Sequence, residues 1–164
     1  MLSVAVLLGA GGTAAADLPQ DLVTGSSIVV TPDFFGPGED LTEQFIVSAH
    51  SGPGGEDPHG MVILRSPLFA EGEVKADVSC MIVSGNHAQV GGRFDKPVVF
   101  DGQIFRWFEF IIDDNGPAGQ GSDMISPIIF RVDLHPPDFD PCSFVLPALL
   151  PIQQGNYTVK DATA

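Results

Sequence analysis

Basic residues are scarce in this chain of 164 residues. Seven Lys and Arg stand against 21 Asp and Glu, which gives a formal net charge of −14. The seven are scattered singly from Arg65 to Lys160. Nucleic acids and anionic membranes are bound through clustered Lys and Arg, so the sequence predicts no nucleic-acid partner. An excess of acidic residues is typical of a soluble surface, and it also attracts cations.

Cysteine is equally scarce, with only Cys80 and Cys142. The chain has no C-x-x-C motif, and a structural zinc site needs more ligands at short spacing. In an exported protein, an even pair of cysteines predicts a disulfide, here between Cys80 and Cys142. The alternative is a pair of buried free thiols.

The chain also lacks a hydrophobic run long enough for a transmembrane helix, so we expect no membrane span. The run Leu2–Ala10 is short and is followed by small residues that end at Ala16. This pattern predicts a signal peptide over residues 1–16 with cleavage before Asp17, although no Lys or Arg precedes the run. We therefore expect a secreted, extracellular protein with a single domain over residues 17–164.

No stretch of ten or more residues shows a convincing helical stripe, although Asp40–Gln44 could form one helical turn. Nineteen Gly and 14 Pro separate short apolar runs, as turns do in an all-β protein. The expected strands are Ser27–Thr31, Gln44–His50, Gly60–Arg65, Val74–Val83, His87–Val90, Ile104–Ile112, Ile128–Leu134 and Gly155–Lys160. These predict a single antiparallel β-sandwich or small β-barrel of about seven to nine strands.

The clearest strand is Val74–Val83, because polar and apolar residues alternate along it. We expect one face to be buried and the other to be more exposed. The buried set is Val74, Ala76, Val78, Cys80 and Ile82, and the exposed set is Lys75, Asp77 and Ser79. A tight turn at Ser84–Asn86 then leads into a hairpin, and Gly91-Gly92 predicts a bulge or a close backbone approach.

The run Ile104–Ile112 is apolar on both faces, which is typical of a central strand. Trp107 lies within it and is expected in the core, although it could instead belong to a sugar- or peptide-binding platform together with Phe34-Phe35.

Several blocks of the chain form a distinctive pattern. They are Phe45-x-x-x-Ala49-x-Ser51, His59-Gly60, Val78-Ser79-Cys80-x-x-Val83-x-Gly85-Asn86-x-Ala88-x-Val90-Gly91-Gly92, Phe108-x-Phe110-x-x-x-Asp114-Asn115-Gly116, Ser122-Asp123-x-Ile125-Ser126, Cys142 and Gly155-Asn156-Tyr157-Thr158-Val159. In this pattern the chain resembles the post-COAP-type domains of secreted bacterial proteins. The resemblance implies export and an all-β fold, and it carries over no catalytic residues.

The best candidate site is the acidic segment after the strand Ile104–Ile112. Asp113, Asp114, Asn115 and Asp123 offer hard oxygen ligands, so we predict that the segment binds calcium weakly. The order of ligands does not match an EF-hand. The alternative is an ordinary hairpin turn, since Asn-Gly is a leading turn dipeptide.

Other candidate chemistry is weaker. His50, Asp57 and His59 flank one loop and could form a metal or catalytic cluster, although isolated loop histidines are commoner. Carboxylates that could be paired for glycoside hydrolysis are Glu39, Asp40 and Glu43, and Glu71 and Glu73. No G-x-S-x-G motif is present.

These observations favour a non-catalytic extracellular β module with a structural or binding role, stabilised by calcium if the acidic segment holds it. Its partner would be an extracellular protein or a carbohydrate. The alternative is a secreted glycoside- or ester-type hydrolase that uses acidic loop residues.

Overall fold

The computed structural model describes residues 19–32, 40–100, 102–117, 122–132, 142 and 149–163. The predicted signal peptide and Phe34-Phe35 lie outside these residues. Ten β-strands are present, and the described residues contain no helix. The strands are β1 (Asp21–Thr31), β2 (Leu41–Ser51), β3 (His59–Arg65), β4 (Glu73–Ser84), β5 (His87–Phe100), β6 (Gln103–Asp113), β7 (Met124–Ile125), β8 (Ile129–Val132), β9 (Leu150–Pro151) and β10 (Gln154–Lys160).

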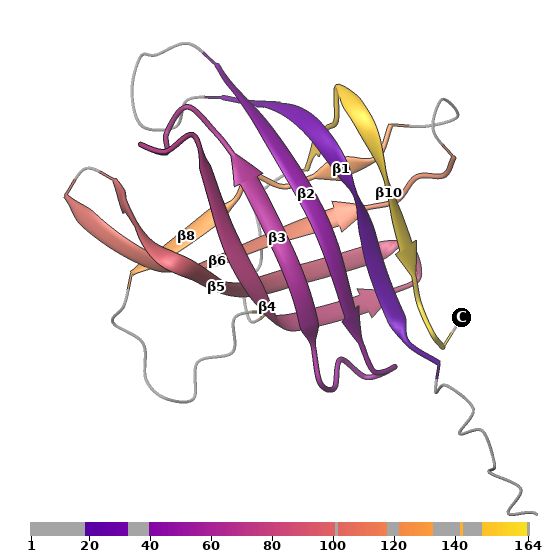
Figure 1. The fold of residues 1–164 in the computed structure, drawn as a ribbon. Helices are drawn as coiled ribbons and strands as arrows, with labels where there is room; N and C mark the ends of the chain where they lie inside the picture. Colours follow the sequence, from indigo (N-terminus) through magenta and orange to yellow (C-terminus); the bar gives the residue numbers. More distant parts are fainter. Residues whose placement is uncertain are drawn as a thin grey trace, which may run out of the picture.

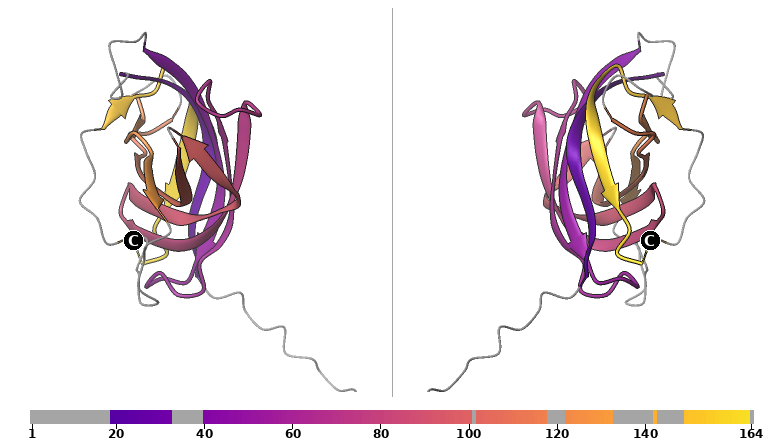
Figure 2. Two further views of the ribbon diagram at one scale, coloured as in Figure 1. Left: turned by 90° about the vertical axis from the view of Figure 1, so that its left-hand side faces the viewer. Right: turned by 90° about the vertical axis from the view of Figure 1, so that its right-hand side faces the viewer.

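The strands form one antiparallel sheet that curls into a half-barrel. Its order is β10-β1-β2-β3-β4-β5-β6-β7-β9, and β8 also pairs with β6. Strands β1 to β4 and β10 form one wall, and β5, β6 and β8 cross behind them (Figures 1 and 2). The predicted all-β antiparallel class is therefore confirmed. The prediction of a central strand is also confirmed, because β6 has β5 on one side and β7 and β8 on the other.

The expected strands were located correctly but several were too short. Strand β1 begins at Asp21 rather than Ser27, and β5 continues to Phe100. The two-residue strands β7 and β9 were not predicted. The helical turn expected over Asp40–Gln44 is wrong, because Leu41 to Gln44 form the start of β2 and pair with β1. The ladder with β1 satisfies the backbone of this segment in an extended conformation.

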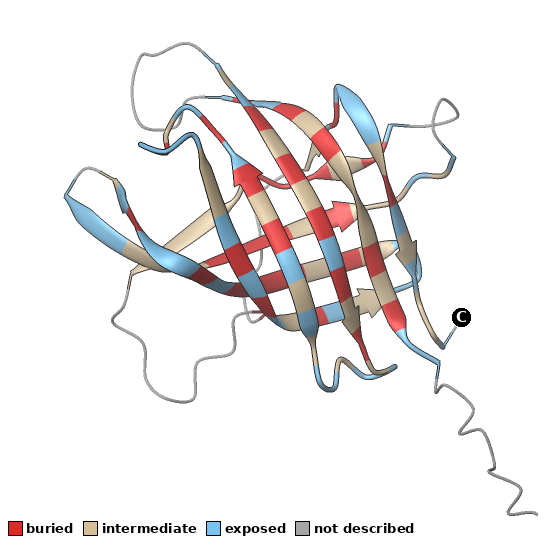
Figure 3. Cartoon of the chain, in the orientation of Figure 1, coloured by how far each residue is buried: buried red, intermediate tan, exposed pale blue. Residues whose placement is uncertain are grey.

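Alternate side chains of the long strands fill the interior of the half-barrel, which gives the banded burial in Figure 3. In β2, for example, Phe45, Val47 and Ala49 are buried while Ser48 between them is exposed. Phe45 meets Phe110 of β6 edge to face, with ring centroids 5.7 Å apart. The core therefore joins the two walls.

A β-bulge in β4 corrects the predicted burial of that strand. The register with β5 shifts between Val78 and Cys80, which leaves Ser79 as an extra residue. Before the bulge Ala76 and Val78 are buried as predicted, but after it Met81 is buried and Ile82 is 47% exposed. One inserted residue reverses the phase of a strand, so the simple alternation placed Ile82 on the wrong face.

Gly92 lies opposite this bulge, and the predicted close backbone approach is confirmed. A Cβ atom at Gly92 would lie 2.0 Å from the carbonyl oxygen of Asp77 and 2.9 Å from the ring of Phe108. The predicted bulge is on β4 rather than at Gly91-Gly92 itself.

We expect Gly92→Ala to lower the free energy of unfolding by about 2–3 kcal/mol, because the backbone of β4 has to move to admit the methyl group. Gly85→Ala is the matched control. Gly85 has a φ of +63° and open space around it, so the same change should cost only about 1 kcal/mol there. Urea denaturation of both variants measures the difference, and equal losses would contradict the close approach.

The predicted disulfide is confirmed. Cys80 and Cys142 are bonded with their Cα atoms 5.9 Å apart, and the described residues contain no free cysteine. The bond joins β4 to a residue 62 positions later in the chain. In the described part of the chain, no helix is long and apolar enough to cross a membrane.

Candidate functional site

Two of the predicted calcium ligands accept hydrogen bonds from the edge of β10. The carboxylate of Asp123 accepts hydrogen bonds from the backbone N–H of Tyr157 at 2.7 Å and of Asn115 at 3.0 Å. The carboxylate of Asp114 accepts from the N–H of Val159 at 3.0 Å and of Gly116 at 2.9 Å. Strand β10 pairs with β1 on its other side, so these carboxylates accept from the edge of β10 that no strand of the described residues covers.

The other two residues of the set point elsewhere. The side chain of Asp113 lies 2.5 Å from the Nδ1 atom of His87. The carboxamide of Asn115 donates to the carbonyl of Ser122. Among the described residues, no group of three or more His, Cys, Asp or Glu side chains is arranged to hold a metal ion. Calcium binding by this segment therefore stays a prediction, and the observed contacts are those of a structural connection.

The connection continues around the end of β10. The backbone N–H of Ile152 donates to the carbonyl of Asp123, and the N–H of Gln153 donates to that of Ile28. In the interior, the hydroxyl of Tyr157 lies 2.7 Å from that of Ser27. Burial raises the pKa of the Tyr157 phenol well above its usual range, so the phenol stays protonated. The C-terminal strand is thus held by buried polar contacts as well as by its ladder with β1.

His50 of β2 and His59 of β3 form a cross-strand pair beside the loop that joins the two strands. His50 and His59 are register partners, and their rings stack with centroids 5.6 Å apart. The Nδ1 atom of His59 is 2.9 Å from the carbonyl oxygen of Asp57, so Asp57 contributes its backbone and not its carboxylate. The three residues are not arranged as a group that could hold a metal ion.

The carboxylates considered for hydrolysis do not act as one pair. Glu73 is bonded to Arg65 at 2.7 Å, and Glu71 lies 3.8 Å from the Nζ atom of Lys96. Glu43 is buried and accepts a hydrogen bond from the hydroxyl of Thr31, while Asp40 is exposed. Glu39 lies outside the described residues. Glu71 and Glu73 line one hollow together, but each of them lies beside a cation of its own.

Trp107 is only half-buried, which corrects its expected place in the core. The guanidinium of Arg93 lies over its ring, 5.7 Å from the centroid, in a cation–π contact between the paired strands β5 and β6.

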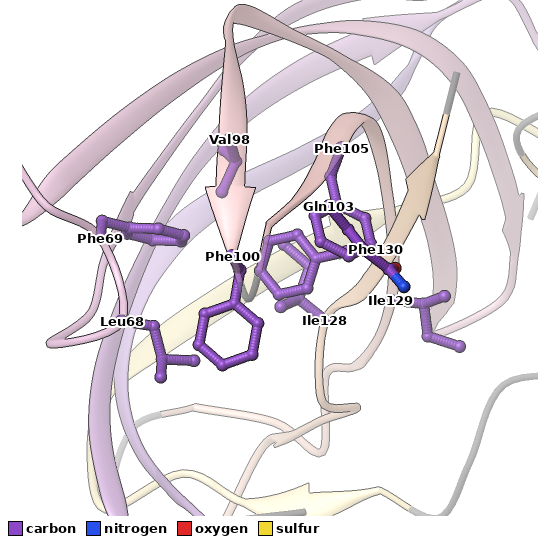
Figure 4. Close-up of a pocket in the computed structure, with 9 residues that line it drawn as sticks. All are labelled: Leu68, Phe69, Val98, Phe100, Gln103, Phe105, Ile128, Ile129 and Phe130. Carbon is purple, nitrogen blue, oxygen red and sulfur yellow. The ribbon is translucent and has the colours of Figure 1, made fainter. Parts of the chain in front are cut away.

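The feature that sequence reasoning missed is a pocket of about 360 Å³ at one end of the half-barrel (Figure 4). Its lining comes from the connection between β3 and β4, the β5–β6 hairpin, and β8 with the residue before it. All the lining side chains are apolar except one carboxamide. They are Leu68, Phe69, Val98, Phe100, Gln103, Phe105, Ile128, Ile129 and Phe130.

Phe130 is the centre of the aromatic side of this pocket. Its ring centroid lies 5.7 Å from that of Phe105, 6.1 Å from Phe69 and 5.9 Å from Phe94. Phe94 in turn packs on the buried ring of Phe108. The wall of the pocket is therefore anchored in the core, which holds its shape.

Gln103 is the exposed member of the lining and marks the mouth of the pocket. It begins β6 directly after the hairpin turn, where its register partner is Phe100. The dipeptide Asp101-Gly102 in the sequence is a strong signal for such a hairpin, and it would have extended the predicted strands into the pocket wall. The outer face of the same hairpin carries Val99 and Ile104, a cross-strand pair that is 64% and 48% exposed.

A pocket of this size and lining is typical of sites for small molecules, which are concave, mostly apolar and carry few polar groups. None of the lining side chains titrates near neutral pH. The arrangement can therefore bury an apolar molecule and offer it one hydrogen-bonding group.

Comparison of the chain with protein-family models, with curated proteins and with solved structures finds no match. The resemblance to post-COAP-type domains thus stays a prediction.

Proposed function

We propose that the protein is a non-catalytic, secreted binding protein that holds a small apolar molecule in the pocket at the end of its half-barrel. The observation that carries the proposal is the pocket itself, with eight apolar lining side chains and one carboxamide. Its volume of about 360 Å³ falls within the usual range of ligand sites, about 300–1,000 Å³.

The surroundings of the pocket support a preformed site. Phe69 and Val98 are buried even though they line it, and the ring contacts of Phe130 fix a third side. A rigid apolar wall gains affinity because little conformational freedom is lost when a ligand binds. The sheet would then serve as the frame of a small β-barrel with its site at one end.

Secretion is the other part of the proposal. The apolar run before Asp17 and the disulfide between Cys80 and Cys142 support it, since disulfides persist mainly in oxidising compartments. The excess of acidic residues fits a protein that stays soluble outside the cell while carrying an apolar molecule.

The test is titration of the full chain with the uncharged fluorescent probe N-phenyl-1-naphthylamine. We expect saturable binding to the wild type, and about tenfold weaker binding to Leu68→Trp, because the larger ring fills part of the pocket. Met61→Trp is the matched control. Met61 is 45% exposed on β3 and does not line the pocket, so its substitution should leave binding unchanged.

Thermal unfolding of both variants checks that each remains folded. An absence of saturable binding to the wild type would contradict the proposed function. Equal weakening by the two tryptophans would also contradict it, because the probe would then be bound outside the pocket.

A further inference from the structure

We infer that the pocket takes an uncharged apolar molecule with one hydrogen-bonding end, such as a medium-chain alcohol or ketone, and discriminates against anionic carboxylates of the same chain length. This inference rests on the proposed binding function and specifies the class of ligand. It is carried by the charges that line and surround the pocket.

The lining itself contains no cation. A carboxylate that leaves water needs a paired, hydrogen-bonded positive charge to offset the loss of its hydration. The polar side chain of the lining is Gln103, whose carboxamide is neutral and can both donate and accept a hydrogen bond. It can therefore satisfy a hydroxyl or a carbonyl group but cannot neutralise an anion.

A buried carboxylate lies behind two of the lining residues. Phe69 and Ile128 line both the pocket and a narrow crevice, and Glu43 and Arg65 also line that crevice. Glu43 is 5% exposed and one of its oxygens accepts a hydrogen bond from Thr31 at 2.8 Å. Within the described part of the chain, no cation lies within ion-pair distance of Glu43. Arg65 is already bonded to Glu73 and Gln44, so the field of Glu43 opposes a second carboxylate in the pocket.

A hollow beside the pocket carries a small excess of negative charge. A second hollow of about 550 Å³ shares Phe69 and Val98 with the pocket, and its lining carries three carboxylates and two lysines. The lysine Lys96 lies near Glu71, and Arg65 on the neighbouring strand is already bonded to Glu73 and Gln44. An anion that approaches from this side therefore meets more carboxylates than cations.

The experiment is displacement of the bound naphthylamine probe by 1-decanol and by decanoate at neutral pH and physiological ionic strength. We expect decanol to compete at concentrations at least about tenfold lower than decanoate. Both molecules have the same chain length, so the apolar contribution is closely matched and the end group decides the difference.

A gain of function sharpens the test. Gln103→Lys adds a cation to the lining and should narrow the difference between decanoate and decanol about tenfold, because an ammonium group can pair with the carboxylate. Ile104→Lys is the matched control. It adds the same charge at the next residue, which is 48% exposed and does not line the pocket, so it should not rescue decanoate.

The outcomes separate the two proposals. A probe that fails to bind contradicts the binding function itself. A probe that binds but is displaced equally well by decanoate and decanol overturns the inference on ligand charge and leaves the binding function standing. Rescue of decanoate by both lysines would also overturn it, because discrimination would then come from the net charge of the protein and not from the pocket.

Discussion

Asp123→Ala is expected to lower the free energy of unfolding by about 3–5 kcal/mol, a large part of the stability of a domain of this size. The side chain is 2% exposed and its two oxygens accept separate backbone hydrogen bonds, from Tyr157 and Asn115. Hydrogen bonds to charged groups are worth about 1.5–3 kcal/mol each, and removal of the acceptor leaves a buried donor without a partner. Urea denaturation followed by tryptophan fluorescence gives the value.

Asp114→Ala is the matched control, because Asp114 lies in the same segment as Asp123 but differs from it in burial. Asp114 also accepts two backbone hydrogen bonds, from Val159 and Gly116, but it is only half-buried. In Asp114→Ala, water can replace part of the hydrogen bonding that the carboxylate supplied. We therefore expect the free energy of unfolding to fall by about 1–2 kcal/mol. Similar losses at Asp114 and Asp123 would show that burial is not what makes Asp123 important.

The same pair of variants separates the structural role from calcium binding. If the carboxylates hold the edge of β10, both losses should be equal in calcium and in chelator at matched ionic strength. If they hold an ion instead, calcium should raise the melting temperature of the wild type by mass action and the variants should lose that increment. A calcium-dependent cost of Asp123→Ala would contradict the structural interpretation.

The strands could be predicted because the pattern that indicates each strand lies within that strand's own sequence. Alternation in β2 and β4 and the turn at Ser84–Asn86 depend only on residues near one another, and the corresponding strands were found. The bulge at Ser79 could not be predicted, because it depends on how β4 meets Gly91 and Gly92 of the next strand. Its effect on Ile82 shows that alternation fixes the two faces of a strand only up to the first bulge.

The role of the acidic segment could not be predicted for a similar reason. Asp114 and Asp123 were identified as a site from their density of oxygen ligands. The donors that they meet belong to Tyr157 and Val159, more than thirty residues further along the chain. A carboxylate that caps a sheet edge and one that binds a metal look the same in sequence, and only the tertiary partner distinguishes them.

The pocket was beyond sequence reasoning because it is assembled from three segments that are far apart in the chain. Leu68 and Phe69 come from a connection between strands, and Phe130 from a strand on the far side of β6. Each apolar residue has an ordinary interpretation as core. Only the curl of the sheet shows that their side chains surround a space instead of filling one.

Removal of the disulfide is expected to have an effect of similar size to that of Asp123→Ala. Cys80 and Cys142 are 62 residues apart, and closing a loop of that length stabilises by about 4 kcal/mol in the chain-entropy model. The double variant Cys80→Ser with Cys142→Ser should therefore unfold at clearly lower urea. The wild type in reductant should unfold at the same concentration, because both treatments open the same loop.

The site of the bond makes this test informative about the fold as well as about the loop. Cys80 lies directly after the bulge residue Ser79, and the Sγ atom of Cys142 is 3.9 Å from the carbonyl oxygen of Gln89 on β5. The bond thus fastens a distant part of the chain to the β4–β5 hairpin. Without reductant, the wild type should show a mass two hydrogens lower than the reduced chain and no thiol open to alkylation. A midpoint that reductant leaves unchanged would contradict the expected stabilisation, since the long loop would then be held by other contacts.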